Sequence, residues 1–193
     1  MSRELSQKLQ KALDESVAAK QAFWKNNENQ FFDVAALLVG AIRNGNKILI
    51  CGNGGSACDS QHFAGELVGK FYKKRMGLPC VALNSDGGIL TCVGNDFGYE
   101  EVFSRQVQAL GKEGDVLIAI STSGNSPNIL EALREAKDIG VKTVLITGGT
   151  GGSAHSFAEH VLCVSDTKST PRIQETHAWI LHSLCECIDE SFG

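Results

Sequence analysis

The chain has 193 residues, of which 42% are hydrophobic and 21% are charged. The length suits one domain with a full core, and the composition excludes a disordered chain, which would be less apolar and more charged. With a net charge of −4 and no apolar run near the ~20 residues that a bilayer requires, we expect neither a nucleic-acid partner nor a membrane partner.

Apolar spacing predicts two helices ahead of the first strand. The first has an apolar residue at every fourth position: Leu5, Leu9, Leu13 and Val17. The second has a similar apolar face: Phe31, Ala35, Leu38 and Ile42. It is expected to end at Asn44-Gly45, a pair that suits the end of a helix. These apolar faces need a partner, either the rest of the chain or another subunit.

Strands and helices alternate through the rest of the chain. Short, continuously apolar strands are predicted at residues 47–51, 80–83, 115–120, 141–146 and 160–164. Helices are predicted after the first strand up to about residue 69, and over 88–93, 99–110, 127–139 and 171–190. The alternation predicts an α/β fold, a three-layer sandwich with a central parallel sheet covered on both faces. We expect a single domain over 1–193, with N-terminal helices in 1–45 and the α/β core and C-terminal helix in 46–193.

Two loops of similar chemistry follow two of the predicted strands. The first is Gly52-Asn-Gly-Gly-Ser56 and the second, here called the serine loop, is Ser121-Thr-Ser-Gly-Asn-Ser126. In a parallel sheet such loops border the ligand crevice, where glycines, hydroxyls and helix N-termini suit an anion. Neither loop is a Walker or GxGxxG motif, so a sugar phosphate is favoured over a nucleotide.

His62 and Glu66 stand four residues apart in the helix that follows the first loop. This spacing places both on one helical face, where an imidazole and a carboxylate can share a divalent metal such as zinc. A simple surface pair is the alternative for these two residues taken alone. Their closeness to a phosphate-type loop favours a functional site.

The last predicted helix offers further polar candidates. Gln174 and His182 are eight residues apart, about 12 Å along the helix axis, which is awkward for two ligands of one metal. His177 lies one turn from Gln174 and is a rival to His182. From the residues alone, His182 could equally be a structural histidine.

Three other features are predicted to have structural or open roles. Lys70, Lys73, Lys74 and Arg75 form a basic cluster that is predicted to be a solvated loop. Asn95-Asp96 could be a helix cap or a hydroxyl-binding corner. The seven cysteines are odd in number and lack CxxC spacing, so we expect small core residues and no disulfide framework.

Acidic and polar residues interrupt the N-terminus, so we expect no signal peptide and a cytoplasmic protein.

These motifs together resemble the sedoheptulose-7-phosphate isomerase (phosphoheptose isomerase) family of the sugar isomerase (SIS) domain superfamily. The resemblance runs from the N-terminal helices to the last helix and covers essentially the whole chain. The matching stretches are Cys51–Ser56, Gln61–Glu66, Val93–Gly98, Gly114–Leu117, Ser121–Ser126 and Arg172–Glu175 with His182. The glycine loops are general to the superfamily. The combination of His62 and Glu66 with Gln174 and His182 is more specific.

The resemblance implies a SIS-type, flavodoxin-like fold and a cytoplasmic homotetramer in which the N-terminal helices pack at the oligomer interface. It implies conversion of sedoheptulose 7-phosphate to D-glycero-D-manno-heptose 7-phosphate, the first step toward the heptose of bacterial surface polysaccharide. One zinc ion per subunit is implied at four ligands: His62, Glu66, Gln174 and His182. Substrate contacts are implied at Asn53, Gly54, Gly55, Ser56, Glu66, Asn95, Asp96, Ser121, Thr122, Ser123, Ser126 and Gln174.

The chemistry of ketose–aldose isomerisation fits these residues. A proton moves between C1 and C2 through an enediolate, which requires a base at carbon and an acid at oxygen. Glu66 is expected to be the base and His182 the acid, although the roles could be exchanged. Some family members have an acidic residue where this chain has Pro171, so no role of that acid is transferred.

A non-catalytic SIS-domain binding module is the alternative function. A relative in the superfamily associates with the bacterial replication initiator, and other members are regulators. The loops alone do not separate the two functions. Glu66 favours the enzyme, since a binding module has no need for a carboxylate beside the sugar.

Overall fold

The computed structural model describes residues 3–193 and begins with one continuous helix, α1 (Arg3–Arg43). The prediction of two separate N-terminal helices is therefore wrong. The segment that joins the two apolar faces contains neither proline nor glycine, so nothing in it ends the helix. The helix does end where predicted: the Gly45 amide bonds to the Ile42 carbonyl, and Gly45 has a φ of 76°.

A five-stranded parallel sheet forms the centre of the fold and confirms the predicted α/β class. Its strands are β1 (Ile48–Gly52), β2 (Cys80–Ala82), β3 (Val116–Ser121), β4 (Lys142–Gly148) and β5 (His160–Val164). Their order in the sheet is β2-β1-β3-β4-β5. Gly52 at the end of β1 pairs with Ile120 of β3, so the first loop and the serine loop leave the sheet side by side.

The helices agree with the prediction except near residue 100. They are α2 (Gly55–Val68), α3 (Gly87–Asp96), α4 (Ser104–Leu110), α5 (Pro127–Asp138) and α6 (Thr170–Phe192). The predicted helix over 99–110 is divided into a 3-10 turn, η1 (Tyr99–Glu101), and α4. The Ser104 hydroxyl donates to the Glu101 carbonyl at 3.2 Å and thereby competes with continuous helix. A second turn, η2 (Ser153–Phe157), precedes β5.

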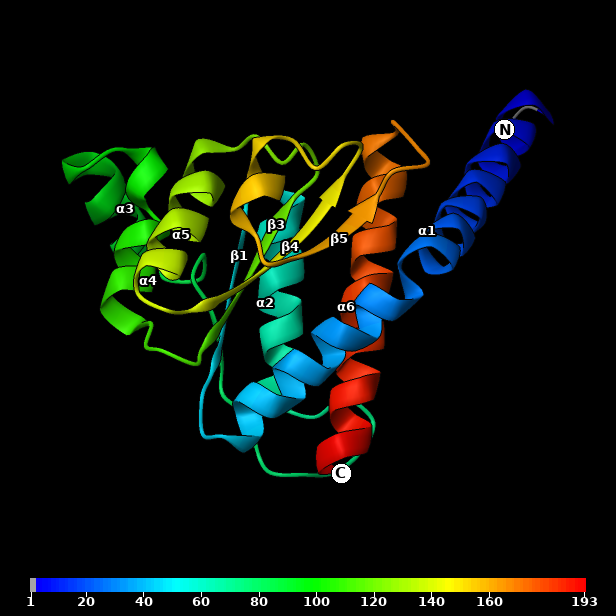
Figure 1. Cartoon of the computed structure of the whole chain (residues 1–193). Helices are drawn as coiled ribbons and strands as arrows, with labels where there is room; N and C mark the ends of the chain where they lie inside the picture. The colour runs from blue at the N-terminus through cyan, green and yellow to red at the C-terminus, as the bar shows by residue number, and fades with distance from the viewer. Residues whose placement is uncertain (1–2) are drawn as a thin grey trace.

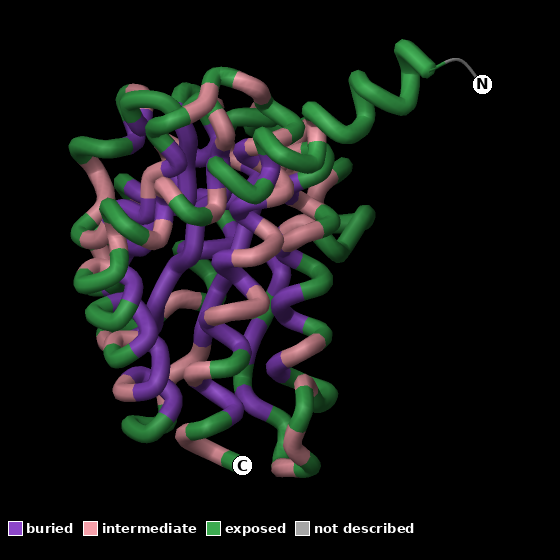
Figure 2. The backbone as a smooth tube through the Cα atoms, turned by 90° about the vertical axis from the view of Figure 1, so that its right-hand side faces the viewer, coloured by how far each residue is buried: buried purple, intermediate pink, exposed green. Residues whose placement is uncertain are grey.

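Three layers result, with helices on both faces of the sheet (Figure 1). Successive strand residues enter opposite cores: Ile48 and Ile50 pack with α1, α2 and α6, whereas Leu49 and Cys51 pack with α4 and α5. Both faces of the sheet are therefore buried, as the tube in Figure 2 shows. This explains why the strands read as continuous apolar runs and not as alternating ones.

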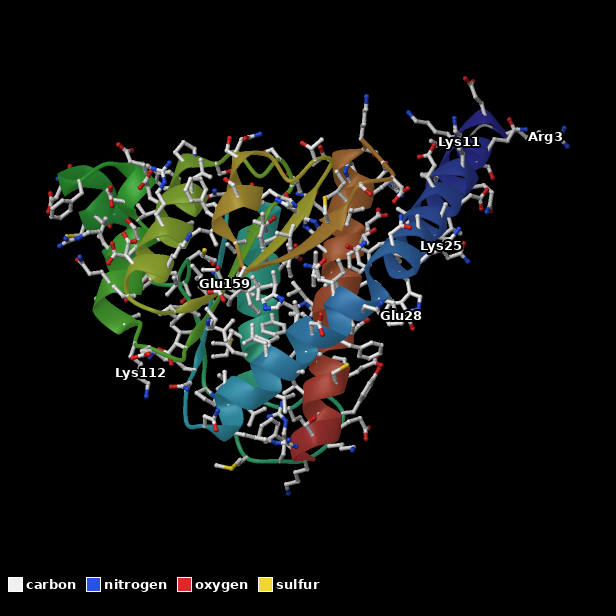
Figure 3. All side chains as sticks on the ribbon, in the orientation of Figure 1. Arg3, Lys11, Lys25, Glu28, Lys112 and Glu159 are labelled. Carbon is white, nitrogen blue, oxygen red and sulfur yellow. The ribbon has the colours of Figure 1, made fainter. Side chains whose placement is uncertain are left out.

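The N-terminal part of α1 projects beyond the body of the molecule (Figures 1 and 2). Charged side chains, including those of Arg3 and Lys11, extend from this part (Figure 3). The apolar residues of its first face are exposed as well: Leu5, Leu9, Leu13 and Val17. Within residues 3–193, no helix combines the length and the apolar character needed to cross a membrane.

The cysteines are free thiols and only partly match the predicted core role. Cys51, Cys80 and Cys185 are buried, and burial raises the pKa of the Cys80 thiol to about 12. Cys58 and Cys92 are exposed. The core prediction is confirmed for the three buried residues and wrong for the two exposed ones.

Candidate active site

The first loop and the serine loop lie where the strand order of the sheet changes direction. From β1 the chain proceeds to β2 on one side, and β3 lies on the other. Open α/β sheets bind their ligands at such a switch point, outside the carboxyl ends of the strands. Both loops lead directly into helices, α2 and α5, whose N-termini favour an anion.

Hydroxyl groups of the serine loop turn toward one another and toward the backbone of the loop. The Ser121 hydroxyl accepts a hydrogen bond from the Gly124 amide at 3.1 Å and lies 3.3 Å from the Ser126 hydroxyl. Ser123 is exposed, and its Oγ accepts from the Asn125 amide at 3.2 Å. A compact turn with several hydroxyls at a helix N-terminus has the chemistry of a phosphate site.

A glycine-rich segment, residues 148–152, supports the serine loop from behind. The Ala154 amide donates to the Gly124 carbonyl at 2.9 Å, and the Ser153 amide donates to Asn125 Oδ1 at 2.9 Å. A Cβ placed on Gly124 would lie only 1.8 Å from the Gly151 carbonyl oxygen. The two loops are therefore in backbone contact, and Gly124 is needed for that contact. No local pattern in residues 148–152 predicts this supporting role.

Asn53 of the first loop is joined to Asn128 of α5 by a reciprocal pair of amide hydrogen bonds. Each Nδ2 donates to the other Oδ1, at 2.8 and 2.9 Å, and the Tyr99 hydroxyl donates to Asn53 Oδ1 at 3.3 Å. These residues line a cavity of about 330 Å³ together with Ser126, Pro127 and Glu100. Asn128 is buried and was missed by sequence analysis, because nothing local marks a residue that acts across two loops.

The other substrate-contact residues predicted from the sequence are distributed over several elements. Gly54 and Gly55 are exposed at the start of α2, whereas Ser56 is buried beneath them. Asn95 and Asp96 form an exposed pair in the last turn of α3, where Asn95 Nδ2 donates to Asp96 Oδ1 at 2.7 Å. The C-cap of α3 is Phe97 and the N-cap of the following turn is Gly98, so the cap role considered for Asn95-Asp96 is wrong.

Three of the four predicted metal ligands meet between α2 and α6. His62 Nε2 lies 3.1 Å from Glu66 Oε1 and 3.4 Å from His182 Nε2. One donor atom from each of the three residues lies within 4.8 Å of the others. His182 therefore joins the predicted pair on α2, and the alternative of a separate structural histidine is wrong.

The arrangement of these donors fits a zinc ion. Two imidazole nitrogens and a carboxylate oxygen are ligands that zinc prefers, at about 2.0–2.2 Å in tetrahedral geometry. Donors at that radius lie about 3.3–3.5 Å apart. The observed separations of 3.1 and 3.4 Å are close to this requirement.

The side chain of Gln174 reaches the start of α2, beside the first loop. Its Nε2 is 3.1 Å from the position that a Cβ on Gly55 would occupy. Because eight residues of helix separate it from His182, about 12 Å along the axis, its side chain must lean along α6 to reach a common ion.

Asp59 precedes His62 by one turn of α2 and is a neighbour that sequence analysis missed. Burial raises the pKa of Asp59, while the charges of His62 and His182 lower it. Asp59 therefore lies within electrostatic range of the same two imidazoles. The i, i+3 spacing with His62 could have indicated this neighbour.

His177, the rival histidine, is completely buried and points away from the cluster. Its Nε2 donates to the Thr147 carbonyl at 3.0 Å at the end of β4. Burial lowers the pKa of His177 to about 4, against a smaller opposite effect of this hydrogen bond. The imidazole is therefore neutral at pH 7 and joins α6 to the sheet.

This lowered pKa predicts a pH-dependent loss of stability. Below pH 6.5 the unfolded chain binds a proton at His177 that the folded chain binds only near pH 4, so the free energy of unfolding falls as the pH falls through this range. At pH 5 this difference in protonation of His177 lowers the free energy of unfolding by about 2 kcal/mol. Urea unfolding at pH 7 and pH 5 checks this, with His177→Gln as the comparison. Equal pH dependence of the wild type and the variant would contradict it.

Comparison with known proteins identifies the relatives of this chain. Residues 13–148 match the SIS domain family. The chain is 48% identical over 182 residues to a phosphoheptose isomerase of Helicobacter pylori strain P12, covering 93% of this chain and 94% of the relative. It is 46% identical over 184 residues to the phosphoheptose isomerase of Aquifex aeolicus, covering 95% and 96%.

A solved structure agrees with these relatives in its fold. The phosphoheptose isomerase of Neisseria gonorrhoeae superposes with a TM-score of 0.91 at 42% identity. The match covers 96% of this chain and 99% of that protein. The likeness therefore includes both loops, α2 and α6.

Proposed function

The chain belongs to the phosphoheptose isomerase family of SIS-domain proteins, and we propose that it converts sedoheptulose 7-phosphate to D-glycero-D-manno-heptose 7-phosphate. The enzyme is an aldose–ketose isomerase. The observation that carries this function is the His62–Glu66–His182 cluster, in which Glu66 Oε1 lies 3.1 Å from His62 Nε2. A carboxylate beside two imidazoles has acid–base chemistry, which a binding module does not need.

One zinc ion per subunit is part of this proposal, with His62, Glu66, Gln174 and His182 as its ligands. Support comes from the spacing of three of the four donors, whose ligand atoms lie within 4.8 Å of one another. When bound, the ion would act as a Lewis acid toward the sugar oxygens and stabilise negative charge.

Glu66 and His182 are proposed to move the protons. Glu66 takes the proton from the carbon next to the carbonyl and returns it to the neighbouring carbon, while His182 donates to and accepts from the oxygens. Glu66 approaches His62 through Oε1, so its second oxygen can serve as the base. The reverse assignment, with His182 at carbon, is distinguished by the pH profiles of the two variants described in the Discussion.

The two loops are proposed to hold the rest of the sugar phosphate. Asn53, Gly54, Gly55 and Ser56 line one side of the crevice, and Ser121, Thr122, Ser123 and Ser126 receive the phosphate. Asn95 and Asp96 are proposed to contact sugar hydroxyls. Binding energy at the remote phosphate then places the reacting carbons.

Ser123→Ala is expected to weaken substrate binding more than it slows the chemistry. A lost hydrogen bond to a charged group costs about 1.5–3 kcal/mol, or roughly 10- to 150-fold in affinity. Steady-state kinetics should therefore show KM rising in this range while kcat changes little. Ser156→Ala is the control, because Ser156 is exposed in η2 and its hydroxyl donates to the Ser153 carbonyl. Unchanged KM in Ser123→Ala would contradict the phosphate assignment.

The chain is also proposed to form a homo-oligomer, and the family resemblance favours a tetramer. The projecting part of α1 leaves Leu9 and Leu13 about 60% exposed, and Trp24, Phe32 and Trp179 border an open apolar cavity between α1 and α6. Apolar surface of this extent favours burial against further copies of the chain. Light scattering at micromolar concentration is expected to give the mass of four chains. A monomer would contradict the proposal.

We place the enzyme in the cytoplasm, as part of heptose synthesis for bacterial surface polysaccharide. Seven free cysteines support a reducing compartment, because disulfides are rare there. The phosphorylated substrate supports the same compartment.

The decisive experiment is incubation of the purified protein with sedoheptulose 7-phosphate, with aldose formation followed by NMR. Turnover is expected, together with its loss on chelation and its return on addition of zinc. Binding of the sugar phosphate without turnover, in zinc-loaded protein, would favour the binding module instead. Full activity in metal-free protein would remove zinc from the proposal and leave Glu66 and His182 as a plain acid–base pair.

A further inference from the structure

Arg75 lies inside the protein, contrary to the prediction of a solvated basic loop. Its side chain is 2% exposed, and its Nε donates to Asp189 Oδ1 at 2.9 Å, where Asp189 is also 2% exposed. The neighbouring Lys73 is partly exposed and pairs with the exposed Glu190 at 2.8 Å. The segment after α2 thus contains one buried ion pair and one surface ion pair, both connecting to α6.

The Asp189 carboxylate holds the segment after α2 against the C-terminal part of α6. Its Oδ2 accepts hydrogen bonds from the backbone amides of Tyr72 at 3.0 Å and Lys73 at 2.7 Å. Burial raises the pKa of Asp189, but the hydrogen bonds from Lys73, Tyr72 and Arg75 outweigh burial and hold the pKa below its ordinary value. The carboxylate is therefore ionised at neutral pH.

The guanidinium of Arg75 binds the end of α2 at the same time. Its Nη2 donates to the Glu66 carbonyl at 3.0 Å and its Nη1 to the Leu67 carbonyl at 2.8 Å. Both carbonyls belong to the last turn of α2, which ends at Val68 and lacks helical partners there. A buried cation at this point also complements the helix dipole.

One of the two carbonyls belongs to Glu66, the residue proposed to carry the proton. Glu66 stands in the final turn of α2, where helices fray, and its partner His182 stands on α6. Arg75 and Asp189 join these two helices one to two turns beyond the cluster. Arg75 and Asp189 therefore help to set the distance between the Glu66 carboxylate and the His182 imidazole.

We propose that Arg75 and Asp189 are positioning residues for the isomerase reaction, holding the last turn of α2 against α6 so that Glu66 and His182 keep their mutual geometry. The inference rests on the proposed function. The proposed role concerns the geometry of the cluster and not stability alone, because a buried ion pair is in itself weak evidence for stability. Displacement of a reacting group by about 1 Å can cost roughly 100-fold in rate.

The test compares Arg75→Lys, Arg75→Met and Asp189→Asn with the control Lys73→Met. The control removes the exposed ion pair of the same loop but leaves the Lys73 backbone amide that Asp189 binds. For each protein, kcat and KM for sedoheptulose 7-phosphate, zinc affinity by competition with a chromogenic chelator, and thermal unfolding are measured. All kinetics are run well below the lowest melting temperature.

We expect kcat to fall 10- to 100-fold in Arg75→Met and Asp189→Asn, with KM within about twofold, because the phosphate loops are remote. Zinc affinity is expected to fall in parallel, as for residues that orient metal ligands. Arg75→Lys keeps the charge but not the fork of donors, so it should lie between Arg75→Met and the wild type. Lys73→Met should match the wild type.

Lower melting temperatures with unchanged kcat and zinc affinity would reduce Arg75 and Asp189 to structural residues and overturn the inference. If Arg75→Met fails to fold, Arg75→Lys and Asp189→Asn decide by the same criteria. Failure of the proposed function is visible separately, since the wild type would then not convert the substrate. If the wild type turns over without metal, the fall in kcat alone decides the role of the ion pair.

Discussion

Replacing Glu66 by glutamine is expected to lower kcat by about 10²–10⁴-fold, the usual contribution of one acid–base group. Glutamine is nearly isosteric with glutamate, and Glu66 is only partly buried, so the fold should persist. The hydrogen-bonding distance of 3.1 Å to His62 can be kept by the amide oxygen. What the amide cannot do is accept a proton from carbon.

His182→Gln is expected to lower kcat over the same range, since His182 is the proposed partner of Glu66. The pH profiles then assign the two roles: removal of the base should abolish the acidic limb of the profile, and removal of the acid the alkaline limb. Isotope exchange of the carbon-bound proton with solvent should stop in the variant that lacks the base.

Two matched controls separate these effects from general damage. Glu113→Gln makes the same change in an exposed residue before β3, at the opposite end of the sheet from the loops. His177→Gln tests the buried rival, which bonds to Thr147 and points away from the cluster. Loss of turnover and zinc in His177→Gln, with both intact in His182→Gln, would show that the wrong histidine was assigned.

Much of the fold and two of the three residues of the cluster could be predicted because the relevant signals are local. Continuous apolar runs with intervening helices indicate a two-sided parallel sheet, and the observed strands begin and end within two residues of the predicted ones. The pair of His62 and Glu66 follows from helical spacing alone. The loops at β1 and β3 could be placed together because neighbouring parallel strands end at one edge.

What local spacing could not predict depends on how separate segments pack, and His182 was expected as a ligand only through the family resemblance. His182 joins His62 only because α6 lies against α2, and no spacing within α6 favours it over His177. Arg75 has the same local pattern as its lysine neighbours, yet it is buried by Asp189, more than a hundred residues away. Asn128 likewise acts through Asn53, in another loop. Such residues carry no signal in their own neighbourhood.

Gly124→Ala is expected to disrupt the serine loop and, with it, phosphate binding. The added methyl would lie 1.8 Å from the Gly151 carbonyl oxygen, and the φ of 64° adds about 1 kcal/mol of backbone strain. Backbone atoms on both sides of the contact cannot rotate away as side chains do, so the two loops must separate. Ser121 and Ser123 then lose their positions, and the loss of two hydrogen bonds to phosphate costs about 10²–10⁴-fold in affinity.

Gly149→Ala is the matched control for this prediction. Gly149 has nearly the same φ, 61°, but a Cβ there meets no atom within 4 Å. The two variants therefore share the strain of the left-handed region and differ in the contact with the backbone of Gly151 and Gly152. Urea unfolding and steady-state kinetics should show about 1 kcal/mol of destabilisation with unchanged KM for Gly149→Ala, against a large rise in KM for Gly124→Ala. Equal KM values in the two variants would mean that the contact between the loops does not position the phosphate site.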